Sequence, residues 1–402
     1  MATQARAALG DLSKRYLRLR PSESRDASLA GGLSGIALVH TALEQAFPGA
    51  GHHARAERSL EHAIEWLGRG PLGPGLYSGI AGVGWVVGHL VEGAEDDEDP
   101  CSAFDAPLLE VLERSPWTDP FDLIDGLVGL GVYALERLPH PSGKQLLACI
   151  VGHLGKTARR QRPGIAWWSD PEWVPMKWRQ TPHPDWNLGV AHGVPGVIAL
   201  LGRVAAADVD AQTRKKARAL LDKAVRWLLA QELPPSDEGC FAHAVTPGVP
   251  GKAARIAWCY GDPGIAATLL VAARAVGEPE WESAALRIAL HAASRPEALS
   301  GVVDAGLCHG AAGVAHIFHR LFLTTGDKRL AKASRLWFGR TLAMRVPGRG
   351  FAGFRARVPG DEAKHHWRAD PGFLTGAAGI ALALVAATTD GEPEWDRALL
   401  LS

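Results

Sequence analysis

Apolar residues recur along this chain in two alternating kinds of helical segment. In the first kind they return every three or four positions among charged residues, which is typical of a helix with one buried face. Segments of this kind are Gln4–Leu19, Ala54–Arg69, Gln212–Gln231 and Lys328–Leu342. In the second kind, as in Gly264–Leu270 and Gly313–Phe318, nearly every residue is small or apolar, which predicts a helix buried on most sides. The pattern predicts an all-α protein.

A Gly-x-x-Gly unit introduces each of the more apolar segments, and it occurs seven times. The pairs are Gly32/Gly35, Gly79/Gly82, Gly126/Gly129, Gly193/Gly196, Gly261/Gly264, Gly310/Gly313 and Gly376/Gly379. Successive first glycines are 47, 47, 67, 68, 49 and 66 residues apart, and loop insertions account for the longer intervals. We expect the glycines to permit a tight start of each buried helix.

Seven alternations of an amphipathic and a buried helix predict an α/α toroid. Seven inner helices would form a parallel barrel inside seven outer helices, and residues 1–402 would be a single domain of this fold. The residue before the first glycine of a pair would then line one rim. These rim residues are Ser78, Asp125, His192, Tyr260, His309 and Thr375.

The segment 166–186 departs from the helical pattern, because it combines several prolines with five tryptophans: Trp167, Trp168, Trp173, Trp178 and Trp186. It predicts a structured loop rather than a helix. We favour packing on the rim for this loop; contact with a peptide, or closure over a site, is the alternative.

Composition narrows the classes of function. The 43 basic and 43 acidic residues cancel, so nucleic acid is not an expected partner. No apolar run approaches the roughly 20 residues of a membrane span, and the N-terminus has no secretory signal, so we expect a cytoplasmic protein without a transmembrane segment. Five cysteines, an odd number, argue against a disulfide framework and suit metal-binding thiols in a reducing compartment.

Two of these cysteines occupy equivalent positions in adjacent repeats. Cys259 lies two residues before Gly261 and Cys308 two residues before Gly310, with His309 directly after Cys308. Two thiolates and one imidazole leave one position of a tetrahedral zinc open, as in catalytic zinc sites. One zinc ion per chain is expected, and the metal alone leaves open whether it activates water or a thiol.

Other polar residues of the expected rim are candidates for proton transfer. His192 has an ordinary pKa near neutrality, which suits a general acid or base. Asp122 and Asp125 are competing carboxylates before the third glycine pair. Arg255 lies four residues before Cys259, so a helical backbone there would place both on one side. Arg255 would then stabilise an oxyanion or enolate, or hold Asp122.

These strings resemble the lanthionine synthetase C family of lantibiotic cyclases over essentially the whole chain. The resemblance rests on Arg255–Gly261 (RIAWCYG), Cys308–Gly310 (CHG), Ala191–Gly193 (AHG) and the repeated glycine pairs. It implies an α/α toroid of seven inner and seven outer helices, with zinc ligands Cys259, Cys308 and His309. It also implies active-site roles for His192, Asp122, Arg255, Trp258 and Tyr260. Asp122, rather than Asp125, matches the family pattern of an aromatic residue, Asp, two apolar residues, a variable residue and Gly.

The implied activity is formation of lanthionine and methyllanthionine rings by addition of peptide cysteine thiolates to dehydroalanine or dehydrobutyrine. The substrate would be a precursor peptide, leader plus core, already dehydrated by a separate enzyme, because the chain has no room for a fused dehydratase. Three alternatives stay open: glutathione addition to dehydroamino acids, a non-catalytic zinc-stabilised peptide-binding scaffold, and a glycosidase using Asp122 and Asp125.

Overall fold

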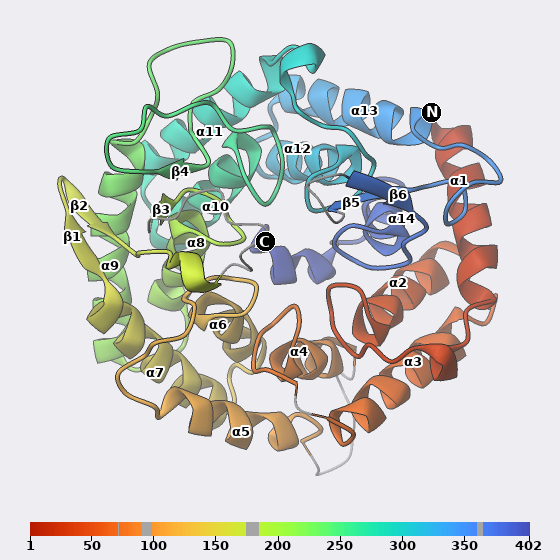
Figure 1. Ribbon diagram of the computed structural model, residues 1–402, viewed down its shortest axis with the longest axis horizontal. Coiled ribbons are helices and arrows are strands. Elements are labelled where there is room, and N and C mark those ends of the chain that lie inside the picture. The colour runs from red at the N-terminus through yellow and green to blue at the C-terminus, as the bar shows by residue number, and fades with distance from the viewer. Residues whose placement is uncertain (71, 91–98, 174–184, 360–364) are drawn as a thin grey trace. The chain divides into compact units, whose positions relative to one another are not determined.

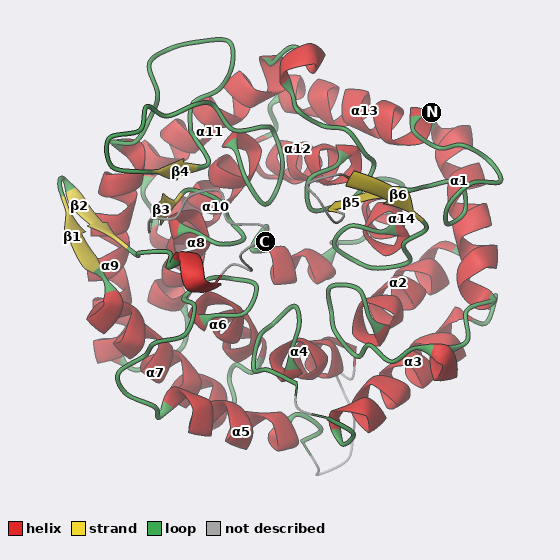
Figure 2. Cartoon of the chain, viewed as in Figure 1, coloured by secondary structure: helices red, strands yellow, loops and turns green. Residues whose placement is uncertain are grey.

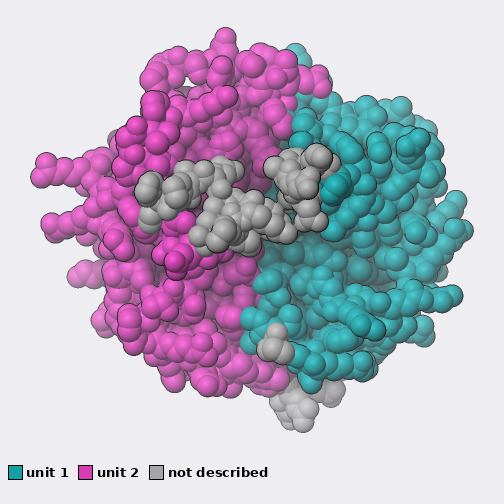
Figure 3. Space-filling model, in the orientation of Figure 1, with its two compact units in different colours: residues 1–73, 77–94, 302–395 teal, residues 74–76, 95–301, 396–402 magenta. Residues whose placement is uncertain are grey.

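The computed structural model describes residues 1–70, 72–90, 99–173, 185–359 and 365–402. Within these residues it contains fourteen α-helices and only short strands, so the predicted all-α class is confirmed (Figure 2). The chain divides into two compact units (Figure 3). Unit 1 comprises residues 1–73, 77–94 and 302–395, and unit 2 comprises residues 74–76, 95–301 and 396–402.

Unit 1 has two layers of helices (Figure 1). The inner layer holds α2 (Leu33–Ala46), α4 (Ile80–Leu90), α12 (Ala311–Thr325) and α14 (Ala377–Ala386). The outer layer holds α1 (Ala2–Leu17), α3 (His52–Leu67) and α13 (Lys328–Ala343). All ten residues of α14 are buried, whereas α3 buries one face only, as its charged sequence predicts.

Unit 2 repeats this arrangement. Its inner layer holds α6 (Leu127–Glu136), α8 (Val194–Ala206) and α10 (Asp262–Val276) (Figure 1). Its outer layer holds α5 (Ser102–Leu112), α7 (Pro141–Thr157), α9 (Ala211–Leu229) and α11 (Pro279–Ser294). Four outer helices were predicted from the periodicity of their sequences, and α1, α3, α9 and α13 begin and end within two residues of those ranges.

Each of the seven inner helices begins at the residue after the first glycine of a pair. Contacts explain why both positions are glycine. A Cβ on Gly126 would lie 2.3 Å from the carbonyl oxygen of Pro120, and a Cβ on Gly129 would lie 2.5 Å from that of Leu123. Gly261 has in addition a φ of +106°, a conformation that side-chain-bearing residues rarely adopt. The helix start therefore folds tightly back on the loop before it.

The loops that precede the inner helices, here called the helix-start loops, lie side by side within each unit. In unit 1 the Cys308 N–H donates to the Leu374 carbonyl (2.7 Å), and the Leu374 N–H donates to Ala30 (3.0 Å). The Ala30 N–H in turn donates to the Tyr77 carbonyl (2.9 Å). All four residues lie two positions before the first glycine of their repeat. Equivalent positions of neighbouring repeats therefore meet at the N-terminal ends of the inner helices.

A similar ladder occurs in unit 2, although Leu123 lies three positions before its first glycine rather than two. The Leu123 N–H donates to the Ala191 carbonyl (3.1 Å), and the Ala191 N–H donates to the Cys259 carbonyl (3.4 Å). Because neighbouring inner helices start from adjacent loops, they run parallel within each unit. The residue before each first glycine lies next to this ladder, as the repeat predicts.

Among the described residues, three two-stranded antiparallel ribbons, which the helical pattern did not predict, lie outside the helices. They pair β1 (Arg159–Gln161) with β2 (Gly164–Ala166), β3 (Trp186–Asn187) with β4 (Ala244–Val245), and β5 (Ala356–Pro359) with β6 (His365–Arg368). None of the described helices is long and apolar enough to cross a membrane.

Between β2 and β3, the described part of the tryptophan-rich segment 166–186 is a loop with one 3₁₀ turn at Pro171–Trp173, as predicted. Trp167 is fully buried, and its indole N–H donates to the Leu154 carbonyl (3.0 Å). Trp168 and Trp186 pack edge to face with ring centroids 4.6 Å apart. The favoured packing role therefore fits these three residues, and Trp178 lies outside the described residues.

Candidate functional site

A histidine and an aspartate from adjacent helix-start loops of unit 2 form a direct pair. His192 Nδ1 and Asp122 Oδ2 are 2.5 Å apart. The second carboxylate oxygen, Oδ1, accepts the N–H of Asp125 (3.0 Å), which fixes the carboxylate in its own loop. The His192 side chain is 45% exposed, against 13% for Asp122. The pair thus combines a fixed carboxylate with an imidazole that a substrate can reach.

The environment of His192 favours its charged form. Burial alone would lower the pKa of His192, but the hydrogen bond and negative charge of Asp122, with further contributions from Cys259 and Asp125, raise it above 6.5. Asp125 itself is exposed, and its Oδ1 atom is so near Gly75 that a Cβ on that glycine would lie 2.5 Å from it. Of the two competing carboxylates, Asp122 is the one hydrogen-bonded to His192.

Tyr260 lies beside this pair. Its hydroxyl accepts a hydrogen bond from Asn187 Nδ2 (3.1 Å), and its ring centroid is 6.4 Å from that of His192 and 5.3 Å from that of His243. Burial raises the pKa of Tyr260, so the hydroxyl stays protonated near neutrality. Burial and the charge of Arg255 lower the pKa of His243, which keeps this imidazole neutral.

Asn187 and His243 were not among the site residues predicted from the sequence. Asn187 lies six residues before Gly193, and Asp26, Asp304 and Asp370 lie at the same distance from their first glycines. In each of these four loops the side-chain oxygen accepts the backbone N–H two residues later, so the spacing was a usable signal. We find no comparable sequence signal for His243.

Arg255 occupies this sixth position before Gly261, and its surroundings correct two expectations. The segment 255–261 forms bends rather than a helix, so helical spacing does not place Arg255 beside Cys259. No hydrogen bond or ion pair joins Arg255 to Asp122 in the described part of the chain. The Nε atom of Arg255 is buried, and it has no hydrogen-bond partner among the described residues. A role in holding Asp122 is therefore not supported.

Trp258 is 1% exposed, and its indole N–H donates to the Leu399 carbonyl (3.0 Å). This contact anchors the C-terminal residues of unit 2 against the helix-start loop. The structure thus gives Trp258 a packing role, and a part in catalysis stays a prediction.

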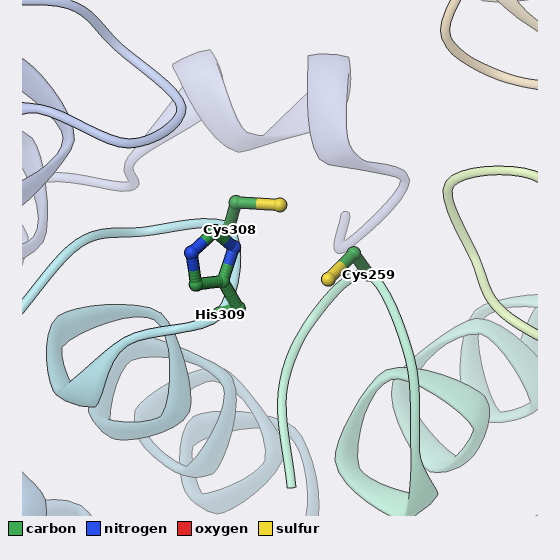
Figure 4. Close-up of side chains that lie close together, drawn as sticks. All are labelled: Cys259, Cys308 and His309. Atoms are coloured by element: carbon green, nitrogen blue, oxygen red, sulfur yellow. The ribbon is translucent and has the colours of Figure 1, made fainter. Parts of the chain in front are cut away.

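The three expected metal ligands are one of the groups of residues that could hold a metal ion. Cys259, Cys308 and His309 each offer one ligand atom, a sulfur or an imidazole nitrogen (Figure 4). Cys259 is buried, while Cys308 and His309 are partly exposed. No disulfide joins any of the five cysteines, all of which the structure describes. Two thiols and an imidazole are a donor set that zinc prefers.

Two further groups of possible ligands occur among the described residues, and both have other partners. In Cys240, Asp262 and His291, the Asp262 carboxylate accepts the N–H groups of Cys240 (2.9 Å) and Phe241 (3.1 Å). In Asp99, Asp105 and His140, the guanidinium of Arg137 binds both carboxylates. A cation already fills the role of a metal in the second group.

Comparison with known proteins identifies the family. The model of the family described as "Lanthionine synthetase C-like protein" matches residues 23–400. The chain belongs to this family. It is 25% identical over 322 residues to the nisin biosynthesis protein NisC of Lactococcus lactis subsp. lactis, covering 74% of this chain and 75% of that protein.

The fold is shared with a solved structure named nisin cyclase. The two superpose with a TM-score of 0.76 and 21% sequence identity, over 99% of this chain and 96% of the other. The predicted fold class, the α/α toroid, is thereby confirmed. The resemblance that the sequence motifs indicated is likewise confirmed by the family match.

Proposed function

We propose that this protein is a zinc-dependent lanthipeptide cyclase that forms lanthionine and methyllanthionine rings in a dehydrated precursor peptide. The observation that carries the proposal is the donor set of Cys259, Cys308 and His309, two thiols and an imidazole that could hold a metal ion, in a member of the lanthionine synthetase C-like family. The similarity to NisC and to nisin cyclase supports a peptide substrate of this kind.

The donor set fits one zinc ion with one position left for a ligand from outside the chain. A thiol bound there loses its proton near neutral pH, so the metal would supply a peptide cysteine as the thiolate. The partial exposure of Cys308 and His309 fits access of a peptide to this position.

Ring formation also requires proton transfers, which we assign to Asp122 and His192. The thiolate sulfur bonds to the β-carbon of the dehydro residue, and the π electrons move onto the α-carbon and carbonyl as an enolate. A proton must then reach the α-carbon, so that sulfur and hydrogen have added across the double bond. His192, accessible and held by Asp122, is suited to move protons between thiol, solvent and enolate. Tyr260 lies beside it, and Arg255 would stabilise the enolate charge.

The remaining expectations belong to the same proposal. We propose one zinc per chain, a separate dehydratase that prepares the peptide, a cytoplasmic location, and one domain spanning residues 1–402. Glutathione addition to dehydroamino acids would use the same thiolate chemistry, with a free tripeptide in place of the peptide's own cysteine. A non-catalytic scaffold would need the zinc but no Asp122–His192 pair.

The decisive experiment incubates the zinc-loaded protein with a dehydrated peptide that carries one cysteine. Ring closure leaves the mass unchanged but removes the free thiol, so alkylation followed by mass spectrometry measures it. We expect the peptide to lose its alkylation with the zinc-loaded protein, and to stay fully alkylated when the zinc has been removed. A peptide that binds without thiol loss would contradict the proposal and favour the scaffold. Glutathione added to the same reaction should give a mass increase above that of an enzyme-free control only if the second activity operates.

A further inference from the structure

Asp304 of unit 1 is buried directly beside the proposed zinc ligand His309. Its side chain is 1% exposed, and its Oδ2 lies 3.7 Å from His309 Nε2. The other oxygen, Oδ1, accepts the N–H of Gly306 (3.2 Å), and Oδ2 also accepts the N–H of Arg357 in β5 (3.2 Å). The carboxylate is therefore fixed from two sides before it meets the histidine.

The neighbouring repeat shows that this arrangement is a property of the loop. Asp370 also lies six residues before a first glycine, and its Oδ1 accepts the N–H of Gly372 (2.7 Å). Its Oδ2 accepts the hydroxyl of Thr375, the residue directly before that glycine (2.8 Å). In both loops one oxygen closes the turn and the other faces the residue before the glycine. In the sixth repeat that residue is His309.

We propose that Asp304 is a positioning residue for His309, which holds the Nε2 side of the ring so that Nδ1 is offered to the metal. This inference rests on the proposed zinc site. A histidine that binds a metal through one nitrogen usually donates the N–H of the other to a carboxylate, carbonyl or water, which fixes the tautomer and strengthens the ligand. The present separation becomes a hydrogen bond after a movement of roughly 1 Å.

Loop architecture alone would not require a charged side chain at this position. Asn187 occupies it in the fourth repeat, and its Oδ1 closes the same turn by accepting the Gly189 N–H (2.8 Å). An asparagine therefore preserves the turn and removes the negative charge. Asp304→Asn separates the two roles of the carboxylate, and Asp370→Asn is the matched control in a loop without a metal ligand.

The test measures zinc affinity of the full-length protein by competition with a chromophoric chelator, without any peptide. We expect Asp304→Asn to weaken zinc binding by about 10- to 100-fold, as is typical for partners of metal-bound histidines, and Asp370→Asn to leave it unchanged. With cobalt(II) in place of zinc, the visible absorption of Asp304→Asn should shift, because the imidazole changes its orientation and basicity. Asp370→Asn should give the wild-type spectrum.

Wild-type zinc affinity and cobalt spectrum in Asp304→Asn would overturn the inference, and so would equal weakening in both variants, which would indicate loosened loops. Thermal unfolding of the metal-free variants shows whether each is folded. A wild-type protein that binds no zinc would overturn the zinc site together with this inference. Failure of ring formation by a zinc-loaded protein would instead refute only the cyclase proposal, since no peptide enters this measurement.

Discussion

His192 and His309 occupy the same position, directly before the first glycine, in the fourth and sixth repeats, yet they have different carboxylate partners. His192 is bonded to Asp122 of an adjacent loop, and its side chain is 45% exposed. His309 faces Asp304 of its own loop, is 21% exposed, and follows a cysteine. The repeat therefore sets where a histidine lies, and the neighbouring side chains determine whether it suits proton transfer or metal binding.

The largest effect is expected from the metal ligands. Cys308→Ala should lose zinc and ring formation together, because two protein ligands retain the ion far less well than three. Metal analysis and the alkylation assay measure both properties. The helical layers do not depend on the ion, so circular dichroism should remain helical. Zinc retained at full stoichiometry by Cys308→Ala would contradict the proposed ligand set.

His192→Ala should separate the two histidines. It should keep zinc, because His192 is no proposed ligand, but slow ring formation by about 10²- to 10⁴-fold, the usual cost of losing a general acid or base. His309→Ala should lose the metal. The comparison fails if His192→Ala releases zinc or if His309→Ala keeps it.

Asp122→Asn should change the pH dependence of the reaction. The carboxylate raises the pKa of His192 above 6.5, so its removal lowers that pKa. Whichever limb of the pH–rate profile His192 produces, acid or alkaline, should therefore move to lower pH in Asp122→Asn. The profile of turnover under saturating peptide measures this shift.

Asp125→Asn is the control for that measurement. Asp125 is exposed and contributes less than Asp122 to the raised pKa of His192, so its neutralisation should leave the rate close to wild type and move the profile less than Asp122→Asn does. A larger change in Asp125→Asn than in Asp122→Asn would mean that Asp125, and not Asp122, is the catalytic carboxylate.

The helices were predictable from sequence, whereas several contacts of the site were not. Local periodicity and glycine spacing located the inner helices, and α8 begins at Val194 directly after Gly193. They also placed Cys259 and Cys308 at equivalent positions, with His309 directly after Cys308. The helical spacing considered for Arg255 does not occur, because the chain forms bends there, and the role of Arg255 stays a prediction. The ribbons and the position of His243 depend on contacts between segments, which a single sequence does not display, whereas Asn187 and Asp304 share a spacing before a first glycine that was overlooked.

The smallest effect on chemistry is expected at Trp258, although it belongs to the same string as Cys259 and Tyr260. Its indole N–H donates to the carbonyl of Leu399, and both residues are buried. Trp258→Phe should therefore reduce stability, because the Leu399 carbonyl loses its donor, while zinc content and rate stay close to wild type.

Trp85→Phe provides the matched comparison for this stability effect. Trp85 is equally buried, but its Nε1 has no hydrogen-bond partner among the described residues. Both substitutions remove the same volume, so their difference isolates the hydrogen bond. Trp258→Phe should be the more destabilising by about 1–3 kcal/mol, the cost of an unpaired buried carbonyl. Denaturant unfolding of the metal-free proteins measures it. If Trp258→Phe instead loses rate without losing stability, the indole acts on the substrate, and its packing contact is incidental.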